Sequence, residues 1–121
     1  MAALALIVGG VVALWISGQN LSVPANYEAV EEWLDVDNFI DYVIINYYVG
    51  NHDWALNTGG KNRYATYNRV DPDGKWRFHS WDAEHVLESL NENRTFLDPS
   101  GQPTEIQHQL MSSPEYRLRF A

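Results

Sequence analysis

The chain of 121 residues contains no cysteine. Disulfide bonds, thiolate zinc sites and cysteine nucleophiles are therefore excluded, and the redox compartment stays undetermined. The side chains that remain as metal ligands are Asp, Glu, Asn and four histidines. Oxygen donors of this kind favour Mg²⁺, Mn²⁺ or Ca²⁺, so any metal centre in this protein is expected to be of that class.

Basic residues are few and unevenly placed. Eight Lys and Arg stand against sixteen Asp and Glu, which gives a net charge of −8, and the first basic residue is Lys61. Nucleic-acid-binding proteins need clustered positive charge to neutralise phosphates, so general binding of DNA or RNA is not expected. The acidic residues suit cations instead, or substrates that are carried with cations.

The N-terminal residues 2–16, AALALIVGGVVALWI, form an apolar run without charge. A membrane-spanning helix needs about 20 such residues, and a signal peptide usually has a basic region before its apolar part, which is not seen here. We therefore set residues 1–17 apart as a segment of uncertain status. A buried helix, or a start that is not native to the domain, is favoured over a signal peptide or membrane contact.

Residues 18–121 have the length and apolar content of one folded domain. Apolar spacing predicts a helix from Asn26, its expected N-cap, to Leu34, and a second helix that Asp37 caps and Gly50 ends. The buried stripe expected on the second helix consists of Phe39, Ile40, Val43, Ile44, Tyr47 and Tyr48. The aromatic residues expected in the core, rather than at a ligand, are Trp33, Tyr47, Tyr48, Trp76 and Phe78.

Two short alternating runs, residues 63–68 and 75–80, are joined by VDPDG and predict a β-hairpin. A helix over residues 82–90 is expected next, with its first aspartate as N-cap, and then two more helices over 104–113 and 113–121. The expected fold is therefore α+β, mainly helical, with one β-hairpin.

Three polar positions stand out around this hairpin. Asp53 in NHDW and Asn62 in KNRY precede the first strand, and Asp82 in SWDAEH follows the second, so we expect all three at one end of the hairpin. Phosphoryl transfer needs a carboxylate that orients or deprotonates the attacking hydroxyl, and further oxygen ligands that hold Mg²⁺ against the phosphates. The order Asp, Asn, hairpin, Asp offers these parts, although Asp and Asn are also the commonest loop and cap residues.

The stretches LDVDNFIDYVIINYYVGNHDW, KNRYATYNR and GKWRFHSWDAEHVLE resemble the CotH kinase family, the atypical kinases named for a spore-coat protein. The most specific pieces are the G-N-x-D-W and W-D-x-E-H motifs, and bacterial members joined to lamin-tail-like domains look closest. The resemblance implies a kinase-like fold that binds ATP with Mg²⁺ or Mn²⁺ and phosphorylates Ser or Thr. It also implies that the substrates are secreted or surface proteins and that the location is extracellular or at the cell surface.

By this resemblance, Asp53 falls on the family's catalytic aspartate and Asp82 on its metal-binding aspartate. Asn62 stands where the family has an Asn before the hairpin strand, which implies a role in holding the metal or the phosphates. Kinases of this kind also use an upstream lobe with a phosphate-binding loop and a lysine, and nothing before Lys61 is basic. We therefore expect residues 18–121 to be the C-terminal-lobe part of a CotH-type domain, with activity that requires the missing lobe.

Each of these residues also has a structural interpretation. Asp53 suits an Asx-turn, Asp82 suits a helix cap worth about 1 kcal/mol, and Asn62 suits a structural role as well as a metal role. Three other members of the motifs, Asn51, Glu84 and His85, receive no firm role.

Two other functions stay open at this stage. One is a non-catalytic adhesion or scaffold module at a surface, with a kinase-like fold. The other is a zinc- or calcium-dependent hydrolase. A zinc site built from His52, His79 and His85 stays open as well, although no motif spacing supports it.

Overall fold

A computed structural model describes residues 12–55, 62–95 and 103–121; the expected apolar segment 1–17 therefore lies mostly outside the described residues. The elements in chain order are helical residues 12–17, α2 (Pro24–Glu31), α3 (Val36–Tyr48), β1 (Arg63–Tyr67), β2 (Trp76–Ser80), α4 (Thr104–Leu110) and α5 (Pro114–Phe120). The prediction of a mainly helical α+β fold with one hairpin is confirmed. No helix in the described ranges is long and apolar enough to cross a membrane.

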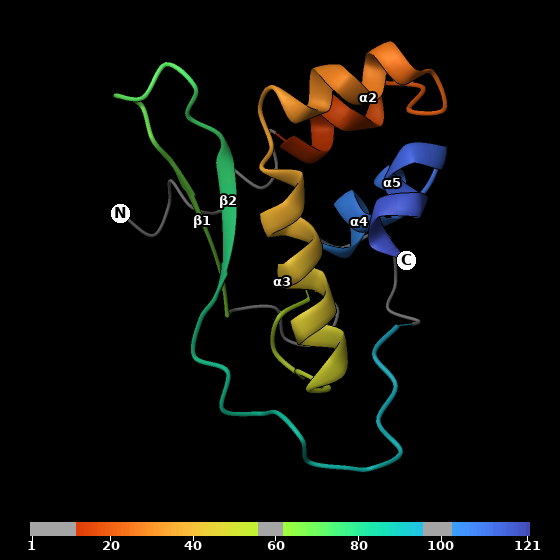
Figure 1. The fold of residues 1–121 in the computed structure, drawn as a ribbon. Coiled ribbons are helices and arrows are strands. Elements are labelled where there is room, and N and C mark those ends of the chain that lie inside the picture. Colours follow the sequence, from red (N-terminus) through yellow and green to blue (C-terminus); the bar gives the residue numbers. More distant parts are fainter. Residues whose placement is uncertain (1–11, 56–61, 96–102) are drawn as a thin grey trace.

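Helix α3 runs through the middle of the molecule (Figure 1). The hairpin lies along one side of α3, α4 and α5 lie on the other, and α2 lies near its N-terminal end. One continuous core joins these layers, because every one of these elements except β1 contributes fully buried side chains to it, and β1 adds the half-buried Ala65. The largest of them are Trp54, Tyr27, Tyr116, Phe39, Ile16, Leu21, Leu34, Ile106 and Leu110.

The start of α3 is set by Asp35. Its side-chain oxygen accepts a hydrogen bond from the backbone N–H of Asn38 at 3.0 Å, as an N-cap does. The expectation that Asp37 caps this helix is wrong, because the backbone is already helical at Val36 and Asp37 lies in the first turn. Gly50 ends the helix as predicted, with a φ of +59° that L side chains rarely adopt.

The buried face of α3 differs in part from the predicted stripe. Ile44 and Tyr48 are 44% and 81% exposed, so the prediction is wrong at these two positions. Tyr42 and Asn46 are buried instead, because β2 packs against their side of the helix. The other predicted members are buried or half-buried: Phe39, Ile40, Val43 and Tyr47.

Helix α2 is shifted toward the N-terminus from its predicted position. It begins at Pro24 with Val23 as N-cap, so the expectation of an Asn26 cap is wrong. It ends before Leu34 because the chain there pairs with β2: the N–H of Trp76 donates to the carbonyl of Trp33 at 2.7 Å. A tertiary strand contact thus ends the helix earlier than its apolar spacing suggests.

The hairpin is confirmed to within one residue at each end. Arg63 pairs with Ser80 and Tyr67 with Trp76 in an antiparallel register. Gly74 is required in the turn, because a Cβ on it would lie 2.1 Å from the carbonyl oxygen of Asn68. The register brings the beginning of β1 and the end of β2 to one end of the hairpin.

The helix predicted over residues 82–90 is wrong. Residues 81–95 form no helix, and Asp82 and Leu87 have φ values of 48° and 57°, in the left-handed region. The segment pairs instead with the loop after α3: the N–H of Leu87 donates to the carbonyl of Val49 at 2.7 Å. The two C-terminal helices are present, although α4 ends at Leu110, before its predicted end at 113, and Ser113 caps α5 by accepting from the N–H of Tyr116.

Candidate active site

A chain of buried amides positions Asp53. The Nδ2 of Asn46 on α3 donates to the Tyr42 carbonyl at 2.7 Å, and its Oδ1 accepts from Nδ2 of Asn51 at 2.7 Å. The Oδ1 of Asn51 then accepts from the backbone N–H of Asp53 at 3.0 Å. Both asparagines are 1% exposed, so these bonds are shielded from water and fix the backbone of Asp53 relative to α3.

The next residue, Trp54, anchors the same loop in the core. Its side chain is fully buried, and its ring meets those of Tyr42 and Tyr47 edge-on at centroid distances of 5.7 and 5.4 Å. Such aromatic pairs add about 0.5–1.5 kcal/mol each beyond the area that they bury. The G-N-x-D-W motif therefore consists of a helix end, a buried amide, an acidic side chain and an aromatic anchor.

Asn62 joins the other two predicted site residues. Its backbone N–H donates to the carbonyl of Asp53 at 3.2 Å, and its side-chain Nδ2 donates to the carbonyl of Asp82 at 3.0 Å. Both bonds use donors, so the Oδ1 of Asn62 is still an available oxygen ligand. The structure thus brings Asp53, Asn62 and Asp82 together, with Asn62 between the two aspartates.

Asp82 does not cap a helix. It is exposed and follows β2 after one intervening residue, Trp81, in a left-handed conformation that costs roughly 1 kcal/mol or more for a residue other than glycine. Aspartate tolerates this conformation better than most residues do. The turn directs the chain from the hairpin back toward the loop that holds Asp53.

His85 lies beside Asp53. Its Nε2 is 4.0 Å from Oδ2 of Asp53 and 3.8 Å from Oε1 of Glu84, while its Nδ1 is 2.7 Å from Oε1 of Glu88. The hydrogen bond to Glu88 is the main reason why the pKa of His85 is raised, and the charges of the three carboxylates act in the same direction. The same bond lowers the pKa of Glu88.

A second histidine, His52, contacts the same segment as His85. The backbone N–H of His52 donates to the carbonyl of His85 at 3.0 Å, and its Nδ1 accepts from Arg94. The Nε2 of His52 lies 3.3 Å from Oε2 of Glu92 and 3.7 Å from Oε2 of Glu88. The loop after α3 and the segment 81–95 therefore contact each other through both backbone and side chains.

The donor chemistry of the site fits a hard cation only in part. Among the described residues, no three His, Asp or Glu side chains are grouped so that they could hold a metal ion. The alternative zinc site is not supported, since His79 lies on β2 and bonds Thr66 instead. Mg²⁺, however, is commonly held by one or two carboxylates together with substrate phosphates and water. Asp82 and the Oδ1 of Asn62 fit such an incomplete set of oxygen ligands.

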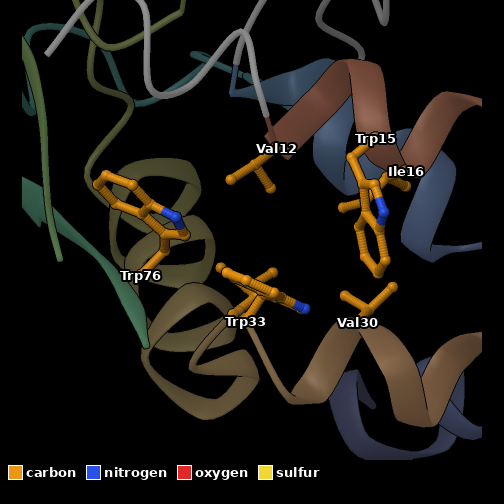
Figure 2. Close-up of a pocket in the computed structure, with 7 residues that line it drawn as sticks. Val12, Trp15, Ile16, Val30, Trp33 and Trp76 are labelled. Atoms are coloured by element: carbon orange, nitrogen blue, oxygen red, sulfur yellow. The ribbon is translucent and has the colours of Figure 1, made fainter. Parts of the chain in front are cut away.

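An apolar pocket of about 220 Å³ lies elsewhere in the molecule (Figure 2). Figure 2 shows Trp15, Trp33 and Trp76 around it; they come from the helical residues 12–17, the turn after α2 and strand β2. Trp33 is 52% exposed, so its expected place in the core is wrong. None of the lining residues belongs to the Asp53 site.

Sequence reasoning missed the contribution of Asn46. A signal for it exists in the sequence, since a polar residue stands among the apolar positions of VIINYY. The contact between His52 and His85 was missed too, because it depends on a segment that was expected to be helical.

Comparison with known proteins agrees with the motifs. The family model described as CotH kinase protein matches residues 16–121, which is most of the chain. No curated protein and no solved structure matches it. With the matched range covering α2 to α5 and both motifs, the chain belongs to the CotH kinase protein family.

Proposed function

We propose that this protein takes part in ATP- and Mg²⁺-dependent transfer of a phosphoryl group to Ser or Thr of a secreted or surface protein. Membership of the CotH kinase protein family supports kinase chemistry in general and suggests a kinase-like fold. The observation that carries the proposal is the bridge by Asn62, which joins the loop of Asp53 to Asp82 through two hydrogen bonds.

Asp53 is the proposed catalytic base. Its carboxylate accepts the proton of the substrate hydroxyl as the hydroxyl oxygen bonds to the γ-phosphorus; the bond from that phosphorus to the β,γ-bridging oxygen breaks, and ADP leaves. The backbone of Asp53 is held on both sides, by Asn51 and by Asn62. This fixed backbone suits a group that has to be oriented toward a hydroxyl.

Asp82 and Asn62 are the proposed metal ligands. When bound there, Mg²⁺ neutralises charge on the phosphates during transfer. Asp82 supplies a carboxylate, and Asn62 supplies its Oδ1 while its Nδ2 holds the turn at Asp82. Asn62 therefore has the structural role that the sequence left open, and the proposal adds the metal role to it.

The direct test is transfer of labelled γ-phosphate, with the protein as its gene encodes it, including any sequence before Met1. Asp53→Asn should lower the rate by about 10²–10⁴-fold, the usual contribution of a general base. Asp82→Asn should lower it too and raise the Mg²⁺ concentration needed for half-maximal transfer. Asp73→Asn removes an exposed carboxylate from the hairpin turn and should leave transfer unchanged. Unchanged transfer in both site variants would contradict the proposal.

A second measurement separates catalysis from the alternative of an adhesion or scaffold module. A ligand that binds only the folded state raises the unfolding temperature, so ATP with Mg²⁺ or Mn²⁺ should raise it and Asp82→Asn should reduce that increase. The absence of any increase, together with the absence of transfer, would favour the non-catalytic module.

A further inference from the structure

An imidazole lies between two carboxylates at the proposed site. The Nδ1 of His85 is 2.7 Å from Oε1 of Glu88, and its Nε2 is 4.0 Å from Oδ2 of Asp53. The distance to Glu88 is that of a strong, charge-assisted hydrogen bond, whereas the distance to Asp53 is about 1 Å too long for one. The ring is therefore fixed at Nδ1 by Glu88, while its Nε2 faces both Asp53 at 4.0 Å and Glu84 at 3.8 Å.

The backbone holds this imidazole in place. The carbonyl of His85 accepts from the N–H of His52, next to Asp53 in sequence, and the N–H of Leu87 donates to the carbonyl of Val49. Leu87 takes a left-handed φ of 57°, which a leucine adopts only where the surroundings enforce it. These bonds make His85 and Asp53 neighbours in the backbone as well as in their side chains.

The charged groups that face His85 are mainly acidic. Asp53 faces it from the loop after α3, and Glu84 and Glu88 face it from its own segment. Glu88 also lies near His52, and Arg94 acts on Glu88 from the end of the segment. The carboxylates stabilise the protonated imidazole, since its pKa is raised above the usual 6.5.

We propose that His85, held by Glu88, is a positioning residue that orients the Asp53 carboxylate when its imidazole is protonated. The inference rests on the proposed function, in which Asp53 is the base. A protonated Nε2, 4.0 Å from Oδ2 of Asp53, attracts that oxygen by its charge and leaves the other oxygen free for the substrate hydroxyl. Neither Glu88 nor His85 needs to touch the substrate in this role.

The role has a pH dependence with a definite sign. The raised pKa means that the folded protein favours protonated His85, so the contact with Asp53 is complete below the unfolded value near 6.5. It is lost as the pH rises through the higher folded value. The transfer rate should therefore decrease as the pH rises through the folded pKa of His85.

Nuclear magnetic resonance of the four imidazoles tests the contact without any need for activity. The Cε1–H signal of His85 is assigned by its loss in His85→Gln, and its titration midpoint in the wild type should lie above 6.5. Asp53→Asn and Glu88→Gln should each lower that midpoint, and Asp73→Asn should not. A midpoint that Asp53→Asn leaves unchanged, or that responds to Glu84→Gln but not to Asp53→Asn, would overturn the proposal.

Transfer of labelled phosphate tests the consequence. His85→Gln should lower kcat by roughly 10- to 100-fold, with less effect on KM for ATP, because it removes an orienting contact. His85→Arg keeps a positive charge that does not titrate, so it should recover part of kcat and remove the alkaline decrease. His79→Gln, on β2, should behave as wild type. If neither the wild type nor any variant transfers phosphate, the proposed function fails, while the titration result still stands. If His85→Gln keeps the pH profile of the wild type, the positioning role alone is overturned.

Discussion

Asn46 is the residue on which the geometry around Asp53 depends most. Its amide contacts the Tyr42 carbonyl, Asn51 and, at 3.3 Å, the hydroxyl of Ser80. Removing it leaves the buried amide of Asn51 without its acceptor, and an unpaired buried polar group costs about 1–3 kcal/mol. Asn46 thus connects α3, the loop that holds Asp53 and the end of β2.

We predict that Asn46→Ala lowers the free energy of unfolding by about 2–3 kcal/mol, the loss expected when buried hydrogen bonds are broken and their partners stay buried. Urea unfolding followed by circular dichroism measures it. The matched control is Asn91→Ala, at an exposed position, which should change stability by less than about 0.5 kcal/mol. Equal losses in the two variants would show that the buried amides do not support this loop.

Single site residues could be predicted from the sequence where they belong to a recognisable motif. They could not be predicted where their role depends only on packing against distant parts of the chain. Asp53 and Asp82 stand in recognisable motifs, and the structure brings them together around Asn62. The left-handed turn at Asp82 has no signal in the sequence, because aspartate is equally common at helix caps and in turns.

Elements were predictable from sequence where local chemistry determines them. The hairpin has alternating strands and a turn with Pro72 and Gly74, so its register follows from neighbouring residues. The helix predicted over residues 82–90 does not form, because the conformation there is set by hydrogen bonds to the end of α3 and the loop after it, 30 or more positions earlier. Contacts of that range leave no periodic pattern in the chain.

Asn46, which positions Asn51 and the loop of Asp53, lies in the C-terminal half of α3. The N-cap that stabilises α3 therefore also supports the site. Burial raises the pKa of Asp35, but the hydrogen bonds from Asn38 and from Arg77, and the charges of Arg77 and Lys75, lower it overall. Arg77 contacts Oδ2 of Asp35 at 2.8 Å. Because the folded pKa is lowered, the ionised cap stabilises the protein above the unfolded value, about 3.9.

We predict that Asp35→Ala lowers the free energy of unfolding by about 1–2 kcal/mol at pH 7, through loss of the cap. The difference from wild type should shrink as the pH falls below about 4, through the lowered folded pKa. Urea unfolding over a pH series measures this. Asp41→Ala, at an exposed position of the same helix, is the control, and a difference that is constant with pH would contradict the assigned charge effect.

For the whole molecule, the described layers are joined at few polar points. The hairpin is tied to α3 by Asn38, whose Oδ1 accepts from the N–H of Phe78 and whose Nδ2 donates to the Phe78 carbonyl. The C-terminal helix α5 is tied to the other side by Arg119, which contacts Asp37, Glu31 and the hydroxyl of Tyr27. Arg119 therefore joins α5 to both α2 and α3, whose contacting residues lie more than 80 positions earlier.

Arg119→Ala should lower the free energy of unfolding, because it removes the polar contacts of α5 with α2 and α3. The pKa of Arg119 is raised by its bonds to Asp37 and Glu31, yet its side chain is 34% exposed, so solvent screening limits the loss to about 1 kcal/mol. Arg119→Lys should lose nearly as much, because all three donors of an ammonium lie on one atom, whereas Arg119 reaches Asp37 with Nε and the Glu31 and Tyr27 side chains with Nη1. Both losses should diminish at high salt, since the contacts are partly exposed.

Urea unfolding at about 0.05 and 1 M salt measures both losses, and the control is Arg69→Ala, at an exposed position of the hairpin turn. If Arg119→Ala is no worse than Arg69→Ala, α5 is held by its other contacts, namely the packing of Tyr116 and Phe120 and the hydrogen bond from the Tyr116 hydroxyl to Gln107.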